Sequence, residues 1–169
     1  MLPKKTNPVM VRFLAGLVLI ALFLSALLQL SWTRNHIQLP YTRFLAALNG
    51  QILNSIGVPV SVQDTVVRQA DYAVEIKQGC DGLDVVILFL SAVIAYPFSW
   101  KSRLTAILYG SLLIFILNLL RTVALFLIGR GSDRTTFEFF HVYIWQFVVI
   151  FLVLVFWIYR IGREKPIAK

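Results

Sequence analysis

Four long apolar runs are the feature that most limits what this chain can fold into. They cover residues 13–30, 83–100, 104–128 and 139–161. A helix rises about 1.5 Å per residue, so each run is close to or above the length that crosses ~30 Å of hydrocarbon. Strand-type alternation is absent from the runs, and only helices and closed barrels satisfy their backbones in lipid. We therefore expect an all-α integral membrane protein with four transmembrane helices.

Composition supports the same class. The chain is 59% hydrophobic and its mean hydropathy is +0.78, which leaves too little polar surface for a soluble domain of 169 residues. That length allows one compact domain, so we expect residues 1–169 to form a single membrane-embedded domain. The first run could pass for a signal peptide, but its apolar core is long and it does not end in a small-residue cleavage site. We expect it to remain as the first helix.

Basic residues are distributed unequally between the two sides of such a bundle. We place the N-terminus, the 97–103 link and the tail after Ile158 in the cytoplasm, and segments 31–82 and 129–138 outside, because Lys and Arg favour cytoplasmic loops. The cytoplasmic side then carries nine basic residues and one acid, Glu164. Topology and anionic lipid account for the net charge of +8, so no nucleic-acid partner is expected. The nine basic residues are Lys4, Lys5, Arg12, Lys101, Arg103, Arg160, Arg163, Lys165 and Lys169.

Residues 31–79 form the one stretch long enough to fold outside the membrane. Apolar residues at helical spacing predict a short amphipathic helix on the outer interface, ended by Gly57 and Pro59. Two alternating segments after it predict a β-hairpin whose second strand leads to Cys80. The predicted apolar face is Phe44, Leu45, Leu48, Ile52 and Ile56, with Arg43, Asn49 and Gln51 on other faces. The predicted strands carry Val58, Val60 and Val62, then Tyr72, Val74 and Ile76.

Cys80 is the only cysteine and lies between the second strand and the second apolar run. Gly79 and Gly82 allow a sharp turn that opens the thiol to a substrate. A helix N-terminus stabilises a thiolate, whereas Asp81 and Asp84 oppose it, so a cationic partner is needed. The alternative is a cysteine that acts as a small buried hydrophobe.

Arg121 lies inside the third apolar run, roughly 12 Å below the helix end at Gly129. An arginine at that depth costs on the order of 2–3 kcal/mol or more and indicates a functional site. Asn118 precedes it by three residues and shares its helix face, so a polar pair points into the bundle. The alternative is an arginine that snorkels to the outer headgroups.

His141 opens the last apolar run at the same outer side. A histidine there could be a hydrogen-bonded aromatic alone, and His36 has no comparable setting. Together, Cys80, Arg121 and His141 supply the thiol, cation and imidazole of a cysteine acyl-transfer site. The chain has no H-E-x-x-H, G-x-S-x-G or P-loop motif. One cysteine and two histidines offer no structural metal spacing, so we expect neither metal nor cofactor.

Three motifs resemble those of the exosortase/archaeosortase family of membrane cysteine transpeptidases. They are Gly79-Cys80-Asp81-Gly82-Leu83, Asn118-Leu119-Leu120-Arg121 and Phe140-His141, and the similarity covers roughly residues 75–150. The segments 96–101 and 137–146, with the small four-helix size, are similar to the short exosortase H subtype associated with IPTL-CTERM substrates. Asp81 departs from the family pattern, in which Ser or Asn is commoner, and makes the local charge less favourable for the thiol.

The resemblance implies an enzyme of the bacterial inner membrane with its active site facing the periplasm. Its substrates would be proteins with a C-terminal motif, a transmembrane helix and a basic cluster, and the acceptor nucleophile stays open. Cys80 would be the nucleophile, Arg121 the oxyanion or thiolate partner, His141 the proton shuttle, and Asn118 would orient Arg121. The alternative function is a non-enzymatic transport or assembly subunit with a polar intramembrane path around Asn118 and Arg121.

Overall fold

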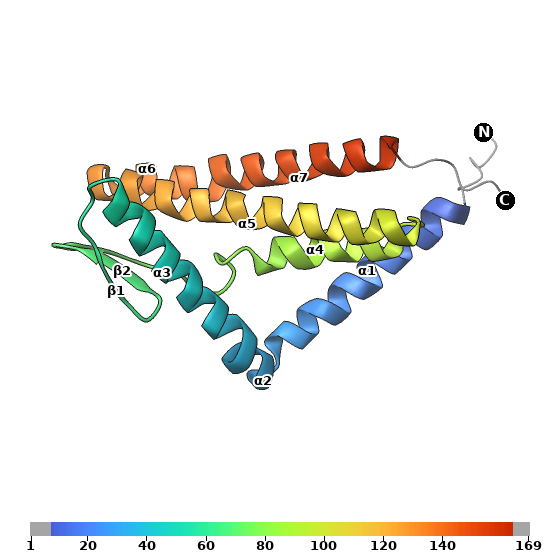
Figure 1. Ribbon diagram of the computed structural model, residues 1–169, viewed down its shortest axis with the longest axis horizontal. Coiled ribbons are helices and arrows are strands. Elements are labelled where there is room, and N and C mark those ends of the chain that lie inside the picture. The colour runs from blue at the N-terminus through green and yellow to red at the C-terminus, as the bar shows by residue number, and fades with distance from the viewer. Residues whose placement is uncertain (1–7, 164–169) are drawn as a thin grey trace.

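Three helices in the computed structural model, which describes residues 8–163, are long and apolar enough to cross a membrane. They are α1 (Pro8–Gln29), α5 (Trp100–Gly131), and a continuous helix that joins α6 (Arg134–Phe139), η2 (Phe140–Ile144) and α7 (Trp145–Gly162). Figure 1 shows α5 and the last helix running along the length of the molecule, α1 slanting from one end toward α2, and a small sheet at the other end. The mainly helical membrane fold is therefore confirmed.

The second predicted span is different, and the four-span count is not confirmed. Helix α4 (Leu83–Ala95) has 13 residues, which is about 20 Å and shorter than the ~30 Å hydrocarbon core. The predicted helix over 83–100 is interrupted because Tyr96 adopts an extended conformation and α5 starts only at Trp100. At its other end, α4 begins deep in the bundle, where Gly82 lies against Asn118 of α5.

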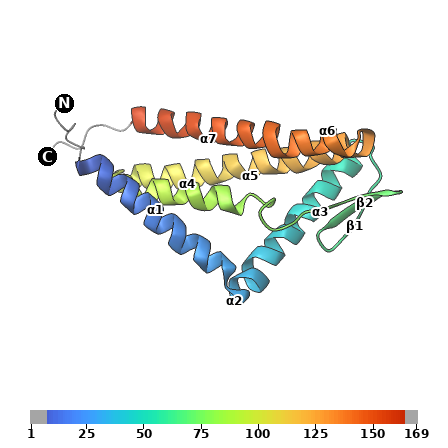
Figure 2. The same cartoon turned by 180° about the vertical axis from the view of Figure 1, so that it is seen from behind.

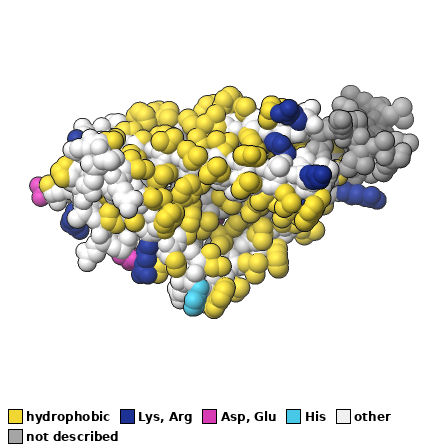
Figure 3. Space-filling model, viewed as in Figure 1, with side chains coloured by type: hydrophobic (Ala, Val, Ile, Leu, Met, Phe, Trp, Pro, Cys, Tyr) yellow, Lys and Arg dark blue, Asp and Glu magenta, His cyan; other side chains and the backbone are white. Residues whose placement is uncertain are grey.

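Helix α5 lies at the centre of the bundle. It contacts α3, α4, α6 and α7, while α1 packs against α4 (Figures 1 and 2). Within the most apolar window of each span, 39% of the residues are buried in α5, but 0% in α1 and 6% in the last helix. Most exposed side chains of α1 and α7 are apolar and form a wide hydrophobic band (Figure 3), as expected of surfaces that face lipid.

Lys and Arg side chains lie at both ends of the molecule in Figure 3, whereas the Asp and Glu side chains seen there lie only toward the end that carries the sheet. Arg160 binds the Ser102 carbonyl and hydroxyl and the Thr105 hydroxyl at 2.7–2.9 Å, which fastens the end of α7 to the start of α5. Arg103 donates to the carbonyl oxygen of Tyr96 at 3.4 Å. Five residues in the topology argument lie outside the described residues, namely Lys4, Lys5, Glu164, Lys165 and Lys169.

The segment after α1 turns the chain back toward α5 through α2 (Ser31–Thr33), η1 (Arg34–Gln38) and α3 (Leu39–Ser55). The predicted amphipathic helix is present as α3, and the residues of its predicted apolar face differ in burial, with Leu45 fully buried. Phe44 and Ile56 are 54% and 55% exposed, whereas Asn49 is buried. The buried face of α3 packs on the sheet and α5. That face consists of Thr42, Leu45, Ala46, Asn49, Gly50 and Leu53.

The predicted hairpin is a three-stranded antiparallel sheet with the order β1-β2-β3. Its strands are β1 (Ser61–Gln63), β2 (Val66–Gln69) and β3 (Tyr72–Glu75). The two predicted strands do not pair with each other, because β2 lies between them. Tight turns with positive φ at Asp64 and Ala70 make this third strand possible. Val67 of β2, 2% exposed, joins a core shared with α3 and α5.

Candidate active site

The loop between β3 and α4 carries the cysteine deep into the bundle. It begins after Ile76, and a backbone bond of 3.0 Å from Cys80 N to the Lys77 carbonyl folds it. Gly79 and Gly82 have φ of +82° and +83°, which L side chains rarely adopt, so glycine is required at both turns. Gly82 is the N-cap of α4, which places Cys80 two residues before a helix N-terminus. This bears out the local reasoning about the two glycines.

The depth of the cysteine differs from the expectation. The loop meets α5 beside Asn118, and α5 continues to Gly131, which is about 20 Å further along the helix axis. Cys80 therefore lies well below the end of α5 rather than at its outer mouth. Non-helical backbone at such depth is tolerated where it is buried in protein or lines a cavity, and this loop does both.

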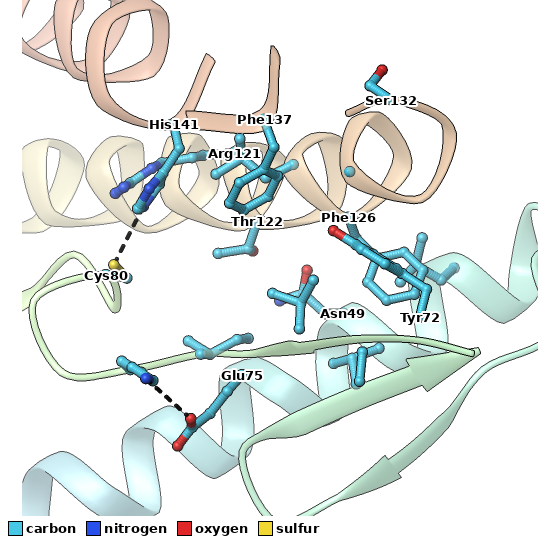
Figure 4. Close-up of a pocket in the computed structure, with 18 of the residues that line it drawn as sticks. Asn49, Tyr72, Glu75, Cys80, Arg121, Thr122, Phe126, Ser132, Phe137 and His141 are labelled. Carbon is cyan, nitrogen blue, oxygen red and sulfur yellow. Dashed lines mark hydrogen bonds and ion pairs between the residues drawn. The ribbon is translucent and has the colours of Figure 1, made fainter. Parts of the chain in front are cut away.

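Cys80 and His141 face each other across the site. The sulfur Sγ is 3.4 Å from Nε2 of His141, within hydrogen-bond distance for sulfur (Figure 4). His141 lies in η2, a π-helical turn within the last long helix, and its ring stacks on Phe137 with centroids 5.6 Å apart. Turns of this kind are frequent at functional sites. The sequence predicted that these two residues approach each other, but it contained no signal for the π-helical turn or for the Phe137 stack.

Arg121 is buried beside this pair. It is 9% exposed and its Nε has no hydrogen-bond partner among the described residues. Within residues 8–163, none of the carboxylates forms an ion pair with it. The side chain does not snorkel to the surface. Its charge is near enough to act on His141 (Figure 4). A buried cation without a counter-ion is costly, so the site gains from any negative charge that forms beside it.

These three residues line one cavity of about 660 Å³. The cavity is bounded by β3 and its continuation to Lys77, by α3, by the second half of α5, and by α6 with the start of η2. Most of its lining is apolar, including Leu125, Phe126 and Phe137. A cavity of this size and character is typical of ligand sites, which are usually apolar with a few placed polar groups.

Asn118 has a role that the sequence did not predict. Its Nδ2 donates a 2.8 Å hydrogen bond to the main-chain carbonyl of Asp81, and the Tyr41 hydroxyl donates to the same oxygen at 3.3 Å. Asn118 is 3% exposed and does not line the cavity. It holds the cysteine loop against α5 rather than orienting Arg121.

The Asp81 side chain turns away from the cavity toward α3. Its Oδ1 accepts from the Leu83 backbone N–H at 3.2 Å, and its Oδ2 accepts from Gln38 Nε2 at 3.2 Å. The Thr42 hydroxyl lies 3.5 Å from Oδ2. Burial raises the pKa of the Asp81 carboxyl, the two hydrogen bonds partly offset this, and the charge of Asp84 adds to it. Asp81 thus anchors the loop through its side chain.

Several of the residues that anchor this loop were not identified from the sequence. Gln38 is the last residue of η1, Thr42 follows one turn later on the buried face of α3, and Tyr41 lies beside Thr42. Burial raises the pKa of the Tyr41 hydroxyl to about 12, and the negative charge of Asp81 adds to this effect. The one available signal was a pair of polar residues at a spacing of four, Gln38 and Thr42. Within residues 8–163, no group of His, Cys, Asp and Glu side chains is arranged to hold a metal ion.

Comparison with known proteins adds one finding. The family model described as transmembrane exosortase matches residues 9–157, which is most of the chain. No curated protein and no solved structure matches the chain. The matched range includes the cysteine loop, the arginine of α5 and the histidine of η2.

Proposed function

The chain belongs to the transmembrane exosortase family, and we propose that it is a membrane cysteine peptidase and transpeptidase. Its substrates would be proteins with a C-terminal sorting tail, made of a short motif, a transmembrane helix and a basic cluster. The observation that carries the proposal is the 3.4 Å approach of Cys80 Sγ to His141 Nε2 in a cavity that also holds an unpaired Arg121. A nucleophile with a base in reach is the usual signature of covalent catalysis.

The reaction follows from this pair. The Cys80 sulfur attacks the carbonyl carbon of the scissile peptide bond, and its proton passes to His141. The C–N bond then breaks, and His141 returns the proton to the leaving amine. A thioester joins the substrate to Cys80. An acceptor nucleophile next attacks that thioester and gives its proton to His141. This attack releases the product from Cys80, and His141 passes the proton to the sulfur, which restores the thiol.

Arg121 would act on the charge that forms during the attack. The carbonyl oxygen becomes an oxyanion in the tetrahedral intermediate, and a buried donor that is already in place stabilises it without reorganisation. A guanidinium that is 9% exposed and lacks an ion-pair partner fits this role. Asn118, Gly79 and Gly82 would support the site by fixing the cysteine loop rather than by contacting substrate.

The orientation in the membrane follows from the distribution of charge. Arg103 lies near the start of α5 and Arg160 near the end of α7, at the end of the bundle opposite the sheet (Figure 1). We propose that this basic end is cytoplasmic, with both termini, and that the cavity faces the periplasm of a bacterial inner membrane. A reporter fused after residue 79 should therefore read as periplasmic, and a cytoplasmic reading would overturn the arrangement. Assignment to the exosortase H subtype stays a prediction.

The test of the activity is processing of a tail-bearing protein in cells. Cys80→Ala and Cys80→Ser should both leave the substrate at its precursor mass, because the covalent route needs the thiol. His141→Ala should slow processing by roughly 10²–10⁴-fold, as for loss of a general acid–base group. His36→Ala is the matched control, since the His36 ring is exposed and its Nδ1 lies 2.9 Å from the Trp32 carbonyl oxygen.

The same experiment separates the alternative of a polar transport path around Asn118 and Arg121. Such a protein would tolerate loss of the thiol. Asn118 does not line the cavity and its amide is engaged by Asp81, which supports processing over transport. Processing at the wild-type rate by Cys80→Ala would make the transport role the better account.

A further inference from the structure

Strand β3 has one free edge. The sheet order is β1-β2-β3, so among the residues that the structure describes β3 pairs with β2 alone. Ile76 N donates to the Thr65 carbonyl at 2.9 Å, which continues the antiparallel register beyond Glu75. Alternate residues of an antiparallel strand point their N–H and C=O groups toward the partner. Tyr72, Val74 and Ile76 therefore face β2, and the backbone groups of Ala73 and Glu75 point away from it.

This free edge borders the cavity that contains Cys80. Every residue from Tyr72 to Lys77 lines it, including both alternating sets, so the edge itself and not one face of the strand forms the wall. Phe137 and His141 lie on the opposite wall (Figure 4). The chain then reaches Cys80 three residues after Lys77. An unpaired row of backbone donors and acceptors thus leads directly to the thiol.

We propose that the substrate segment before the scissile bond binds as a fourth strand on the free edge of β3. This inference rests on the proposed function and adds the mode of substrate recognition. Main-chain hydrogen bonds to Ala73 and Glu75 would supply affinity that does not depend on sequence. Every second substrate side chain would enter the apolar cavity beside Leu125 and Phe126, which would supply selectivity.

The direction of the added strand follows from the path of β3. Tyr72 lies against Gly129 near the end of α5, whereas Cys80 lies at the level of Asn118. Strand β3 therefore descends into the bundle toward the thiol. A substrate whose tail helix continues into the membrane below Cys80 also descends, so it would run parallel to β3. Parallel bonds are evenly spaced, and alternate substrate residues would turn both N–H and C=O toward β3.

The free edge of β3 has no neighbouring strand to cover it among the described residues. Exposed strand edges invite pairing with other chains, and proteins usually cover or shorten them. Here the edge is enclosed by helices on the far side of the cavity. Its exposed side chains are charged at Glu75 and Lys77, which are 3.5 Å apart.

A backbone-modified peptide series tests the binding mode without catalysis. The protein is full-length Cys80→Ala in lipid nanodiscs, and the probe is a fluorescein-labelled peptide of alanines followed by Ile-Pro-Thr-Leu. Each alanine is N-methylated in turn and affinity is measured by fluorescence anisotropy. Loss of one backbone bond should weaken binding roughly three- to tenfold. We expect this loss at every second alanine and little loss at the residues between them.

Proline substitutions test the protein side. Glu75→Pro removes an N–H that faces the cavity and leaves the pairing with β2 intact, so it should weaken peptide binding roughly three- to tenfold. Glu75→Ala separates loss of the carboxylate from loss of the N–H. Val62→Pro is the matched control, because Val62 N–H faces away from β2 at the opposite edge of the same sheet.

The outcomes distinguish this inference from the proposed function. The added strand is supported if N-methylation weakens peptide binding at every second alanine and if Glu75→Pro, but not Val62→Pro, weakens peptide binding. The added strand is ruled out if the peptide does not bind, or if N-methylation weakens binding equally at every alanine or at none. It is also ruled out if Val62→Pro weakens peptide binding as much as Glu75→Pro does. These outcomes hold even where the wild-type protein processes substrate. Failure of the wild-type protein to process any tail-bearing substrate counts against the proposed function, whatever the peptide series shows.

Discussion

The side-chain amide of Asn118 donates a 2.8 Å hydrogen bond to the main-chain carbonyl of Asp81, which ties the middle of α5 to the residue that follows Cys80. The donor is 3% exposed and the contact spans 37 residues of sequence. This bond therefore helps to set the distance between the cysteine loop and Arg121 of the same helix. The first prediction concerns this bond.

Asn118→Ala should slow processing by roughly 10- to 10²-fold, because displacing a catalytic group by about 1 Å has effects of that size. The Tyr41 hydroxyl, at 3.3 Å, would be the remaining donor to the Asp81 carbonyl. Stability should fall by about 1–3 kcal/mol as a buried partner is lost. The measurement is substrate turnover at saturation, in which kcat should fall more than KM rises.

Ser91→Ala is the control for the Asn118 variant. Ser91 is also buried and bonds the Ile87 carbonyl at 2.7 Å within α4, away from the loop. It should lose some stability and keep its turnover. Equal turnover in Asn118→Ala and wild type would show that the bond does not position the cysteine.

The second prediction concerns Gly82. Its φ is +83°, and a Cβ there would lie 2.9 Å from Cγ of Asn118. Gly82→Ala should combine a backbone cost of roughly 1–2 kcal/mol with displacement of the cysteine loop. Gly57 has φ of +81°, and a Cβ added there would have nothing within 4 Å, so Gly57→Ala carries the backbone cost alone.

Thermal unfolding and turnover of the two glycine variants separate these effects. Both variants should unfold at lower temperature than wild type. Turnover should be lost in Gly82→Ala and kept in Gly57→Ala. A Gly57 variant as inactive as the Gly82 variant would mean that general stability, and not loop geometry, controls activity.

Much of the site could be predicted because its residues conflict with their surroundings. A lone cysteine between glycines and an arginine in an apolar run are costly unless they have a role, so composition and hydropathy alone single them out. The structure then brings Cys80, Arg121 and His141 to one cavity. The sharp turns at Gly79 and Gly82 could also be predicted, since glycine favours the positive φ that both residues adopt.

The errors arose where tertiary packing decides the outcome. Helical periodicity did not reveal which face of α3 packs inside the protein, where Asn49 is buried with Leu45 and Ala46 against the sheet and α5. The length of the apolar run predicted a full transmembrane helix after Leu83, but α4 has only 13 residues. Hydropathy does not reveal that the loop before α4, which carries Cys80, already enters the bundle. The anchoring of Asp81 by Gln38 joins residues 43 apart, which no local pattern reveals.

The third prediction concerns Arg121. Arg121→Lys should slow processing by roughly 10²–10³-fold, as for removal of an oxyanion donor, because an ammonium lacks the planar fork of the guanidinium. Arg130→Lys is the control on the same helix, where an exposed guanidinium donates to Gln69 Oε1 at 3.0 Å. It should process substrate at close to the wild-type rate. Comparable rates for the two variants would remove Arg121 from the mechanism.

The last prediction concerns the pH dependence of stability through Asp81. Burial is the main cause that raises the pKa of this carboxyl, and hydrogen bonds from Leu83 N and Gln38 offset only part of it. The folded state therefore binds the proton more tightly than the unfolded state, whose carboxyl pKa is about 3.9. The stability gained from protonation is complete below the unfolded value and is lost as pH rises through the folded value. Relative to Asp81→Asn, the wild-type protein should thus become less stable with rising pH across that window and then level off. Paired thermal unfolding in detergent, with both proteins measured at each pH, checks the sign because other titrating groups cancel in the difference. A difference that grows in favour of wild type as pH rises would mean that the anchored carboxylate is stabilised by its hydrogen bonds more than it is destabilised by burial.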